Sequence, residues 1–254
     1  NENTMKTIIL AGGRGSRISE YTDKIPKPMI EIGGKPILWH VMKSYSNYNQ
    51  NDFVLALGYK SEIIKEYFLN YYNYNSNFTI DLESNNLNFH DQKKEKWKVS
   101  LIDTGLDSMT GGRLKNLKNY INNETFLLSY GDSFGDIDIG SLIKFHKSHG
   151  KLVTVTAVRP QARFGELEIN NNLVSSFKEK PQVNSGWING GYFVMEADFL
   201  NYIDSSNTIL EKDPLERASS EGELMAYTHE GYWHCMDNIR DKINLDLFFK
   251  NKKF

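Results

Sequence analysis

The sequence predicts an α/β protein built on a mostly parallel, twisted sheet with helices on both faces. Two features predict this fold class. Short apolar runs of strand length alternate along the chain with segments whose apolar residues recur at helical spacing. The first apolar run ends in the glycine-rich stretch AGGRGSR, and ligands of open parallel sheets bind beyond the carboxyl ends of the strands.

Apolar runs bounded by polar residues or glycine predict the strands, at residues 7–10, 53–57, 99–102, 126–130 and 152–158. Apolar residues at helical spacing predict helices over residues 37–45 and 61–71, around 114–121 and 142–143, and from about residue 239. Pro36 suits the first turn of its helix, and Ser61 is a candidate N-cap.

Two stretches depart from this alternation. Residues 84–98 are rich in Asn, Lys and Asp, which predicts an exposed loop or ribbon. Residues 165–169 and 173–177 flank three consecutive asparagines, and because asparagine tolerates positive φ they predict a hairpin. Since the chain shows no internal repeat and no linker, we expect a single domain over residues 5–254, with two halves that meet near residue 135.

The composition limits the classes of partner. The 254 residues include 30 Lys and Arg against 32 Asp and Glu, a formal charge of -2. This balance predicts no nucleic-acid partner and no membrane surface, so any anion site is local. The single cysteine, Cys235, cannot form an internal disulfide and is expected to be buried or half-buried. The chain shows neither a leader pattern nor an apolar segment of bilayer length, which predicts a cytoplasmic protein.

The glycine-rich stretch after the first strand is a candidate anion site. Glycine lets backbone N–H groups approach an anion closely, and Arg14 and Arg17 add positive charge. An ATP-binding P-loop would need G-x-x-x-x-G-K-[ST], and a dinucleotide fingerprint would need a third glycine and an acidic residue after the second strand. That strand ends in Gly58, Tyr59 and Lys60 instead. The glycines alone are equally compatible with a tight turn and solvated arginines.

Lys27 favours the anion site. It stands between Pro26 and Pro28, which fix φ on both sides and have no backbone N–H to donate. A lysine held so stiffly, shortly after a glycine loop, suits a polyphosphate; the alternative is a surface lysine in a proline-rich loop. Met29 and Ile30 resume the apolar pattern at once, which favours the first interpretation.

The stretches ILAGGRGSR and KIPKPMIEIGGKPILWHVM resemble those of the sugar-1-phosphate nucleotidylyltransferases. DTGLDSMTGGRLK, YGDS, RFGELEI, FKEKP and INGGYFV narrow the resemblance to the glucose-1-phosphate cytidylyltransferases, from about Met5 to Phe249, with SMTGGRL as its most specific part. It implies a Rossmann-like, mostly parallel mixed sheet flanked by helices, assembled into oligomers. It also implies the Mg2+-dependent conversion of CTP and α-D-glucose 1-phosphate into CDP-glucose and pyrophosphate, for deoxysugar and surface polysaccharide biosynthesis.

The resemblance assigns roles to matched positions. Lys27, Arg17 and Asp132 would be catalytic, with Arg17 on the β and γ phosphates and Lys27 on the α-phosphate. Asp132 and Asp237 match the two carboxylates that hold the metal. The implied nucleotide site consists of Leu10, Ala11, Gly12, Gly13, Gly15, Ser16, Arg17, Lys27, Thr104, Gly105, Arg113 and Asp132, and the implied sugar phosphate site of Gly165, Glu179, Lys180, Asn189 and Gly190.

Within these sites, Arg113 matches the family's second phosphate-contacting arginine. Glu179 would bind a sugar hydroxyl and Lys180 the sugar phosphate, with Gly165 and Asn189 lining the hexose pocket. Residues from 5 to about 135 would then be the nucleotide-binding half, and residues from about 136 to 254 the sugar phosphate-binding half.

Some positions depart from the family pattern. YGDS replaces YGDG, Arg159 and Gln161 stand in a stretch that is usually less polar, and Trp187 precedes INGG where a smaller apolar residue is common. These departures leave the reaction type intact and leave open another sugar 1-phosphate, such as a heptose. The same reaction with another nucleotide is a separate alternative, against which the SMTGGRL stretch argues. A non-catalytic sugar-nucleotide-binding protein is a further alternative. Such a protein would not need Lys27 or the carboxylates of Asp132 and Asp237, and the presence of all three residues favours an enzyme.

The chemistry of nucleotidyl transfer suits this residue set. A sugar phosphate has a second pKa of about 6 and is largely dianionic at neutral pH, so its attack needs no general base. Cations are needed instead, because the two substrates repel each other, and Lys27, Lys180, Arg17 and Mg2+ would supply them. His146 and His149 lack a carboxylate or cysteine at ligand spacing, so we expect surface residues there rather than a zinc site.

Overall fold

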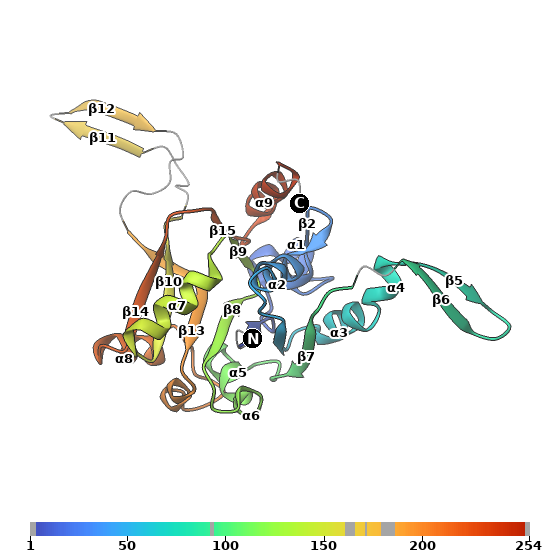
Figure 1. The fold of residues 1–254 in the computed structure, drawn as a ribbon. Helices are drawn as coiled ribbons and strands as arrows, with labels where there is room; N and C mark the ends of the chain where they lie inside the picture. The colour runs from blue at the N-terminus through green and yellow to red at the C-terminus, as the bar shows by residue number, and fades with distance from the viewer. Residues whose placement is uncertain (1–3, 92–93, 161–165, 171, 179–185, 252–254) are drawn as a thin grey trace.

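The structure is a computed structural model that describes residues 4–91, 94–160, 166–170, 172–178 and 186–251. Within these residues the main sheet has seven strands, drawn in Figure 1. Their spatial order is β14 (Leu224–His229), β10 (Val153–Val158), β13 (Ile188–Met195), β8 (Phe126–Tyr130), β1 (Lys6–Leu10), β4 (Asp52–Leu57) and β7 (Lys98–Asp103). Strand β13 is antiparallel to both neighbours and the other pairs are parallel, which confirms the mostly parallel mixed sheet.

Shorter strands pair outside the main sheet. These pairs are β2 (Glu31–Ile32) with β3 (Lys35–Pro36), β5 (Asn77–Asp81) with β6 (Asn86–Asp91), β9 (Ser133–Gly135) with β15 (Trp233–Cys235), and β11 (Glu166–Asn170) with β12 (Leu173–Lys178). The α-helices are α1 (Ser19–Thr22), α2 (Ile37–Ser46), α3 (Ser61–Leu69), α4 (Tyr71–Asn75), α5 (Thr110–Asn116), α6 (Lys118–Ile121), α7 (Ile139–His149), α8 (Asp213–Ser220) and α9 (Ile239–Asn251). The 3-10 helices among the described residues are η1 (Ser16–Ile18), η2 (Lys27–Met29) and η3 (Ala197–Tyr202).

Helices cover both faces of the main sheet. On one face α2, α3 and α7 pack against strand residues such as Ile9 and Leu55. On the other face α5, α6, η3 and α8 pack against their sequence neighbours, such as Ile8 and Val54. Because successive side chains of a strand point to opposite faces, strands buried on both faces form the continuous apolar runs from which the sequence predicts them.

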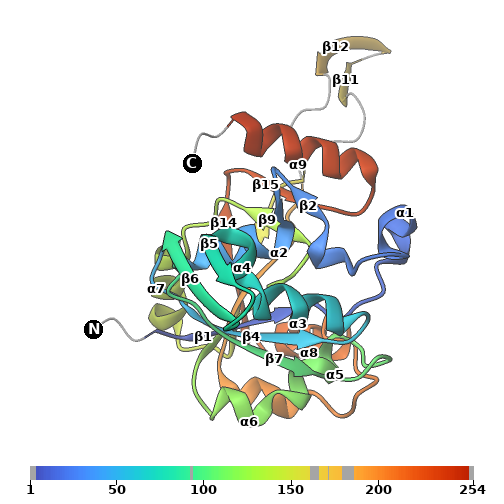
Figure 2. The same cartoon turned by 90° about the vertical axis from the view of Figure 1, so that its right-hand side faces the viewer.

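The C-terminal helix α9 packs on a third, smaller core beside β2 and β9 (Figure 2). Phe249 stacks on the ring of His40 from α2, with ring centroids 3.9 Å apart. The Asp246 carboxylate accepts a hydrogen bond from the backbone N–H of Gly33 at 2.8 Å. These contacts attach the helix to residues of the first half and place the segment around Asp237, which precedes the helix.

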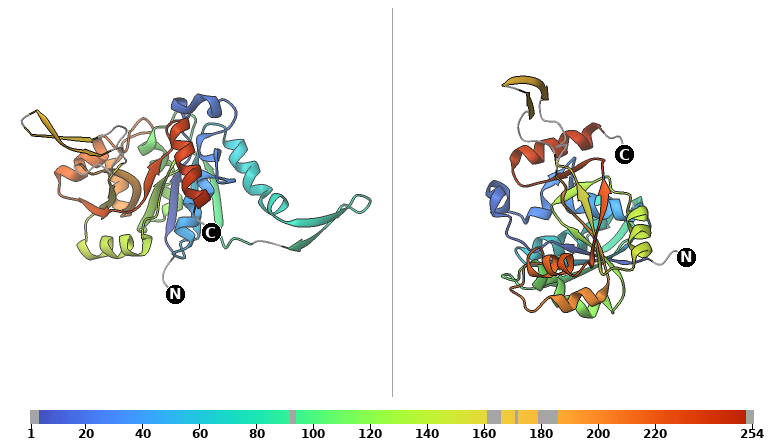
Figure 3. Two further views of the ribbon diagram at one scale, coloured as in Figure 1. Left: turned by 90° about the horizontal axis from the view of Figure 1, so that it is seen from above. Right: turned by 90° about the vertical axis from the view of Figure 1, so that its left-hand side faces the viewer.

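Strands β5 and β6 form a ribbon that extends away from the main sheet (Figure 3). Its apolar side chains alternate onto one face, where Phe78 lies beside Phe89 with ring centroids 5.6 Å apart and Ile80 is paired with Leu87. Phe78, Ile80, Leu82 and Leu87 are all exposed. We call this surface the apolar ribbon face. The exposed ribbon expected within residues 84–98 is confirmed.

The predicted strands and helices are present, with differences at their ends. The prediction that Ser61 is an N-cap is wrong, because Ser61 is the first residue of α3 and follows Lys60, whose left-handed backbone (φ 49°) starts the helix without a side-chain cap. The helix expected over residues 61–71 stops at Leu69, and α4 continues from Tyr71. Pro36 immediately precedes α2 rather than lying in its first turn.

The prediction that His146 is a surface residue is also wrong. Its side chain is 2% exposed. Its ring nitrogens lie 2.8 Å from Thr154 Oγ1 and 3.0 Å from Glu196 Oε1. Helix α7 therefore uses this histidine to bind β10 and the residue after β13, which gives the buried polar ring two partners.

Candidate active site

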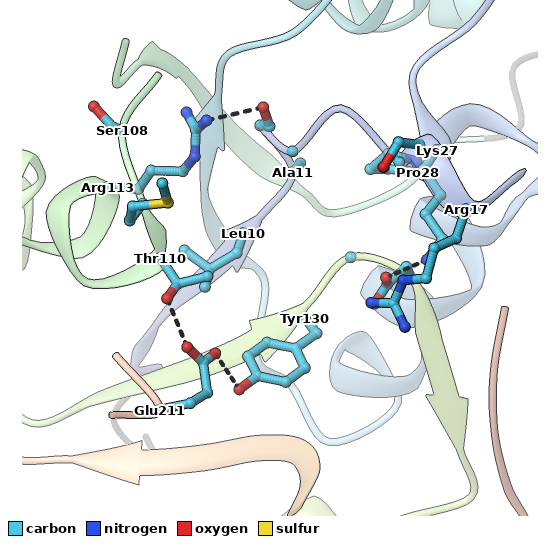
Figure 4. A pocket seen from close by; sticks show the side chains of 17 residues that line it. Leu10, Ala11, Arg17, Lys27, Pro28, Ser108, Thr110, Arg113, Tyr130 and Glu211 are labelled. Atoms are coloured by element: carbon cyan, nitrogen blue, oxygen red, sulfur yellow. Dashed lines mark hydrogen bonds and ion pairs between the residues drawn. The ribbon is translucent and has the colours of Figure 1, made fainter. Parts of the chain in front are cut away.

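A cavity of about 450 Å³ lies beyond the carboxyl ends of β1 and β8 (Figure 4). The loops after these strands, the start of α5 and Glu211 line it. Most of the expected nucleotide site faces this cavity, namely Leu10, Ala11, Gly12, Gly13, Gly15, Ser16, Arg17, Lys27, Arg113 and Asp132. Ligands of open α/β sheets bind at this edge, so the position agrees with the sequence-based expectation.

The glycines of the loop meet three different needs. A Cβ on Gly12 would lie 2.4 Å from Nη1 of Arg113, so a side chain there would displace the arginine. Gly15 has φ +62°, a left-handed conformation that glycine adopts at little cost. At Gly13, apart from its two chain neighbours, no atom of the described residues lies within 4 Å of the position that a Cβ would take. Of these three, Gly13 leaves the most room for a ligand to approach the backbone.

Arg113 holds the loops of the cavity together. It is 4% exposed, and its Nη2 donates to the carbonyl oxygens of Gly12 and Leu106. Its Nη1 donates to the carbonyl oxygens of Leu57 and Gly105 and to the Thr104 hydroxyl, at 2.6–3.2 Å.

These acceptors follow or end β1, β4 and β7, so one guanidinium joins three neighbouring strand ends. Thr104 and Gly105 do not line the cavity but support it through this contact. The expected phosphate contact of Arg113 stays a prediction.

Lys27 lies between the two carboxylates that were expected to hold a metal. Its side chain is 8% exposed, so the alternative of a surface lysine is wrong. Its Nζ donates to Asp132 Oδ2 and to Asp237 Oδ1, each at 2.8 Å. Arg17 Nη1 donates to the other carboxylate oxygen of Asp237 at 2.9 Å, and the Arg17 side chain remains 77% exposed. Two cations and two carboxylates therefore meet beside the glycine loop.

The ionisation of this cluster follows from its contacts. Burial lowers the pKa of Lys27, but the charges and hydrogen bonds of Asp132 and Asp237 outweigh burial, so that the pKa lies above its ordinary value. Burial raises the pKa of Asp237, but Lys27 and Arg17 outweigh it in the opposite direction, so that this pKa is lowered. At neutral pH Lys27 is charged and Asp237 is ionised.

A capping network at the start of α9 orients Asp237. The carboxylate of Asp241 accepts hydrogen bonds from the backbone N–H groups of Asp237 and Asn238, at 2.9 and 3.1 Å. In return the Asn238 side chain accepts the N–H of Asp241, and His234 contacts the other Asp241 oxygen at 3.1 Å. The side chain of Asp237 is thereby left to face Lys27, while its neighbours satisfy the helix end.

A second cavity, of about 330 Å³, adjoins the first through Glu211, which lines both. Asn189 lines it, as expected of the hexose site. Gly190 is buried against β10, where an added Cβ would lie 2.7 Å from Val158, so Gly190 permits close strand packing and does not line the cavity. Gly165, Glu179 and Lys180 lie outside the described residues.

Two of the departures from the family pattern lie beside this second cavity. The guanidinium of Arg159 stacks over the ring of Trp187 at 4.1 Å from its centroid, and Trp187 lines the cavity. Gln161 lies outside the described residues.

Sequence reasoning missed several residues that line the first cavity, which are Pro28, Ser108, Met109, Thr110, Tyr130, Gly131 and Glu211. Most of them lie inside stretches that carry the family resemblance, KIPKPM, SMTGGRL and YGDS, so the motifs themselves were the available signal. No motif marks Glu211. It reaches the cavity because the segment before α8 packs beside α5, a contact between distant parts of the chain.

None of the helices in the described residues combines the length and the apolar character that crossing a bilayer needs.

Residues 6–244 match the family model described as nucleotidyl transferase. The glucose-1-phosphate cytidylyltransferase of Salmonella typhimurium is 48% identical over 250 residues, which cover 98% of this chain and 97% of that protein. The probable glucose-1-phosphate cytidylyltransferase of Bacillus subtilis is 42% identical over 243 residues, 95% of each chain.

Solved structures share the fold. A putative glucose-1-phosphate thymidylyltransferase from Bacillus anthracis is similar with a TM-score of 0.73 at 16% identity, over 98% of this chain and 97% of that chain. Fold and sequence agree: the chain belongs to the nucleotidyl transferase family and, within it, to the glucose-1-phosphate cytidylyltransferases.

Proposed function

We propose that this protein joins CTP and α-D-glucose 1-phosphate into CDP-glucose and releases pyrophosphate. The observation that carries the proposal is the cluster of Lys27, Asp132 and Asp237 beside the glycine loop, in a chain 48% identical to a glucose-1-phosphate cytidylyltransferase. The cluster supplies the charges that the transfer of a nucleotidyl group requires.

The first cavity suits the nucleotide. Backbone N–H groups of the loop around Gly13 are open to a phosphate chain, and the exposed side chain of Arg17 can turn toward its β and γ phosphates. Lys27 projects from the stiff segment after the loop and would meet the α-phosphate. A buried ammonium stabilises the charge that develops on this phosphorus during transfer.

In the reaction, an oxygen of the sugar phosphate forms a bond to the α-phosphorus of CTP, and the bond from that phosphorus to the pyrophosphate oxygen breaks. Because the attacking phosphate is already dianionic near neutral pH, with a second pKa of about 6, no residue has to take a proton from it. The chain's work is to hold both substrates in line and to neutralise their mutual repulsion.

Asp132 and Asp237 would hold Mg2+. Their oxygens are the hard donors that Mg2+ prefers, and both lie 2.8 Å from the same lysine nitrogen, so they can converge on one ion. Within the described residues no group of three or more His, Cys, Asp or Glu side chains could hold a metal, so phosphate and water oxygens would complete the shell. The ion would neutralise charge on the phosphates of CTP.

We assign the sugar phosphate to the second half of the chain. Glu179 and Lys180 would bind a sugar hydroxyl and the phosphate, and Asn189 in the second cavity would meet the hexose. The residues up to about 135 would serve the nucleotide, in agreement with the many residues of this half that line the first cavity.

The protein would also assemble with copies of itself. A two-stranded ribbon is marginally stable alone in water, and the apolar ribbon face exposes four large side chains, Phe78, Ile80, Leu82 and Leu87. Covering this face in a second copy would remove them from water. Sedimentation of the purified chain, with Ile80→Asp and Leu87→Asp variants, tests this assembly.

Pyrophosphate release tests the reaction. The chain is incubated with Mg2+, with each of CTP, UTP, dTTP and GTP, and with glucose 1-phosphate or another hexose or heptose 1-phosphate. We expect release with CTP and glucose 1-phosphate at a kcat/KM at least tenfold above every other combination. Release from glucose 1-phosphate with another nucleotide and not with CTP would show the assignment to be wrong.

A further inference from the structure

A chain of hydrogen bonds connects the two cavities. The Thr110 hydroxyl donates to Glu211 Oε2 at 2.7 Å, and the Tyr130 hydroxyl donates to Glu211 Oε1 at 2.6 Å (Figure 4). The Tyr130 oxygen in turn accepts a hydrogen bond from Nδ2 of Asn189 at 2.9 Å. This series of hydrogen bonds starts at α5 beside the first cavity and ends at β13 in the second cavity.

The carboxylate of Glu211 sets the direction of every bond in this chain. An ionised carboxylate only accepts hydrogen bonds, so Tyr130 must give its single proton to Glu211. The Tyr130 oxygen can then only accept from its other neighbour, which has to be the amide nitrogen of Asn189. An amide can be turned by 180° with little change of shape, and this arrangement selects one of the two orientations.

Two backbone groups fix the ends of the chain. The N–H of Gly191 donates to Oδ1 of Asn189 at 2.8 Å, so turning the amide would leave that N–H facing a donor. The N–H of Leu210 donates to the Thr110 hydroxyl at 2.9 Å, so the Thr110 proton is directed to Glu211. Every member therefore has a defined donor or acceptor role.

We propose that Glu211 is a positioning residue, which acts through Tyr130 to hold the Asn189 amide in the orientation that meets the sugar phosphate. This inference rests on the proposed function. A carboxylate is a poor direct partner for two anionic substrates, but it is a strong fixed acceptor between them. Asn189 is exposed in the second cavity, with one N–H and one oxygen lone pair left for hexose hydroxyls.

The test uses Glu211→Gln and Tyr130→Phe, which keep size and remove the fixed acceptor or the hydroxyl. We expect the KM for glucose 1-phosphate to rise about five- to tenfold, the loss of roughly one neutral hydrogen bond, while the KM for CTP changes less than twofold. In a background of Asn189→Ala, adding Glu211→Gln should have no further effect on the KM for glucose 1-phosphate, because the group that it positions is gone.

Tyr202 and Glu221 provide a matched control, since the Tyr202 hydroxyl bonds to the Glu221 carboxylate on the surface, away from both cavities. Tyr202→Phe and Glu221→Gln should leave both KM values unchanged. Equal rises in the two KM values, values like those of the control variants, or additive effects with Asn189→Ala would overturn the proposal. If Tyr130→Phe does not fold, the KM values of Glu211→Gln alone test the proposal. Failure of the proposed function has a different signature, because the unaltered chain would then release no pyrophosphate from CTP and glucose 1-phosphate.

Discussion

The Nζ of Lys27 lies 2.8 Å from Oδ1 of Asp237, 210 positions later in the chain. This pair joins the segment after the glycine loop to the residues that begin the last helix. Asp132, after β8, brings a second carboxylate to the same nitrogen at the same distance. Three remote segments thus bring one cation and two carboxylates together beside the glycine loop, and each of these residues can be tested separately.

Changing either carboxylate to an amide should abolish most turnover and leave the fold intact. We expect Asp132→Asn and Asp237→Asn to lower kcat at least about 100-fold, because a neutral amide is a poor ligand for a hard cation. The amide oxygen can still accept from Lys27, so the melting temperature should fall by no more than about 4 °C, the equivalent of roughly 1 kcal/mol. Pyrophosphate release across a Mg2+ titration and calorimetric melting measure the two effects.

Asp107→Asn is the control for that experiment, because Asp107 also pairs with an arginine, Arg14, yet its side chain is 87% exposed. It should change neither turnover nor stability. A carboxylate site whose Asn variant keeps near-normal turnover at limiting Mg2+ does not hold the ion.

Removal of the buried ammonium should affect the chemical step more than nucleotide binding. In Lys27→Met the stem is kept and the charge is lost, so we expect kcat to fall about 100- to 1,000-fold, as for the loss of one group that stabilises transition-state charge. The dissociation constant of CTP, measured by calorimetry, should rise less than about tenfold.

Lys180→Ala, by contrast, should weaken glucose 1-phosphate binding and leave CTP binding near its normal value. Equal losses of CTP affinity in the Lys27 and Lys180 variants would contradict this division of roles.

The sequence predicted the sheet well because its strands are buried on both faces. Ile8 and Ile9 face opposite helical layers, so the run stays apolar whichever face is considered. His146 shows where such reasoning fails. Its position on α7 predicts polar surface, but contacts with Thr154 on the next strand and with Glu196, 50 residues later, make burial favourable. Partners of this kind leave no local pattern.

The residues of the candidate site likewise divide into those that a local sequence pattern marks and those that depend on contacts between distant segments. Lys27 was predictable because two prolines and a glycine loop mark it locally, and the resemblance located both of its carboxylate partners. The five acceptors of Arg113 were not predictable, because they are backbone carbonyls and a hydroxyl that come together only when three strands lie side by side. Glu211 was missed for the same reason.

Protonation of His40 should destabilise the protein at low pH. Burial lowers the pKa of His40 below its ordinary value of 6.5, although its contact with the carbonyl of Ile32 at 2.6 Å opposes the shift. Above pH 6.5 the His40 side chain is mostly neutral in both the folded and the unfolded state. As the pH falls below 6.5, the unfolded state takes up the proton first and stability is lost until the lower folded pKa is reached.

In His40→Gln, whose amide can still donate to that carbonyl, this loss should be absent. The melting temperature of the unaltered chain should therefore fall more steeply between pH 7 and pH 5 than that of the variant. Parallel melting curves across this range would show that His40 is not the titrating group.

Replacement of Arg113 should reveal whether it supports the cavity or binds phosphate. Lysine has three donors in place of five and no planar fork, so in Arg113→Lys several carbonyls of the loops after β1, β4 and β7 lose their partners. At about 1–3 kcal/mol for a buried group left unpaired, and about 2–4 °C per kcal/mol for a chain of this size, the melting temperature should fall by roughly 2–12 °C. Arg14→Lys is the control. Arg14 forms an exposed ion pair in the loop after β1, so this variant should melt at the same temperature as the unaltered chain. An Arg113→Lys protein that melts like the unaltered chain but binds CTP at least tenfold more weakly would instead establish Arg113 as a phosphate ligand, because lysine keeps the charge while only direct contact depends on the shape of the fork.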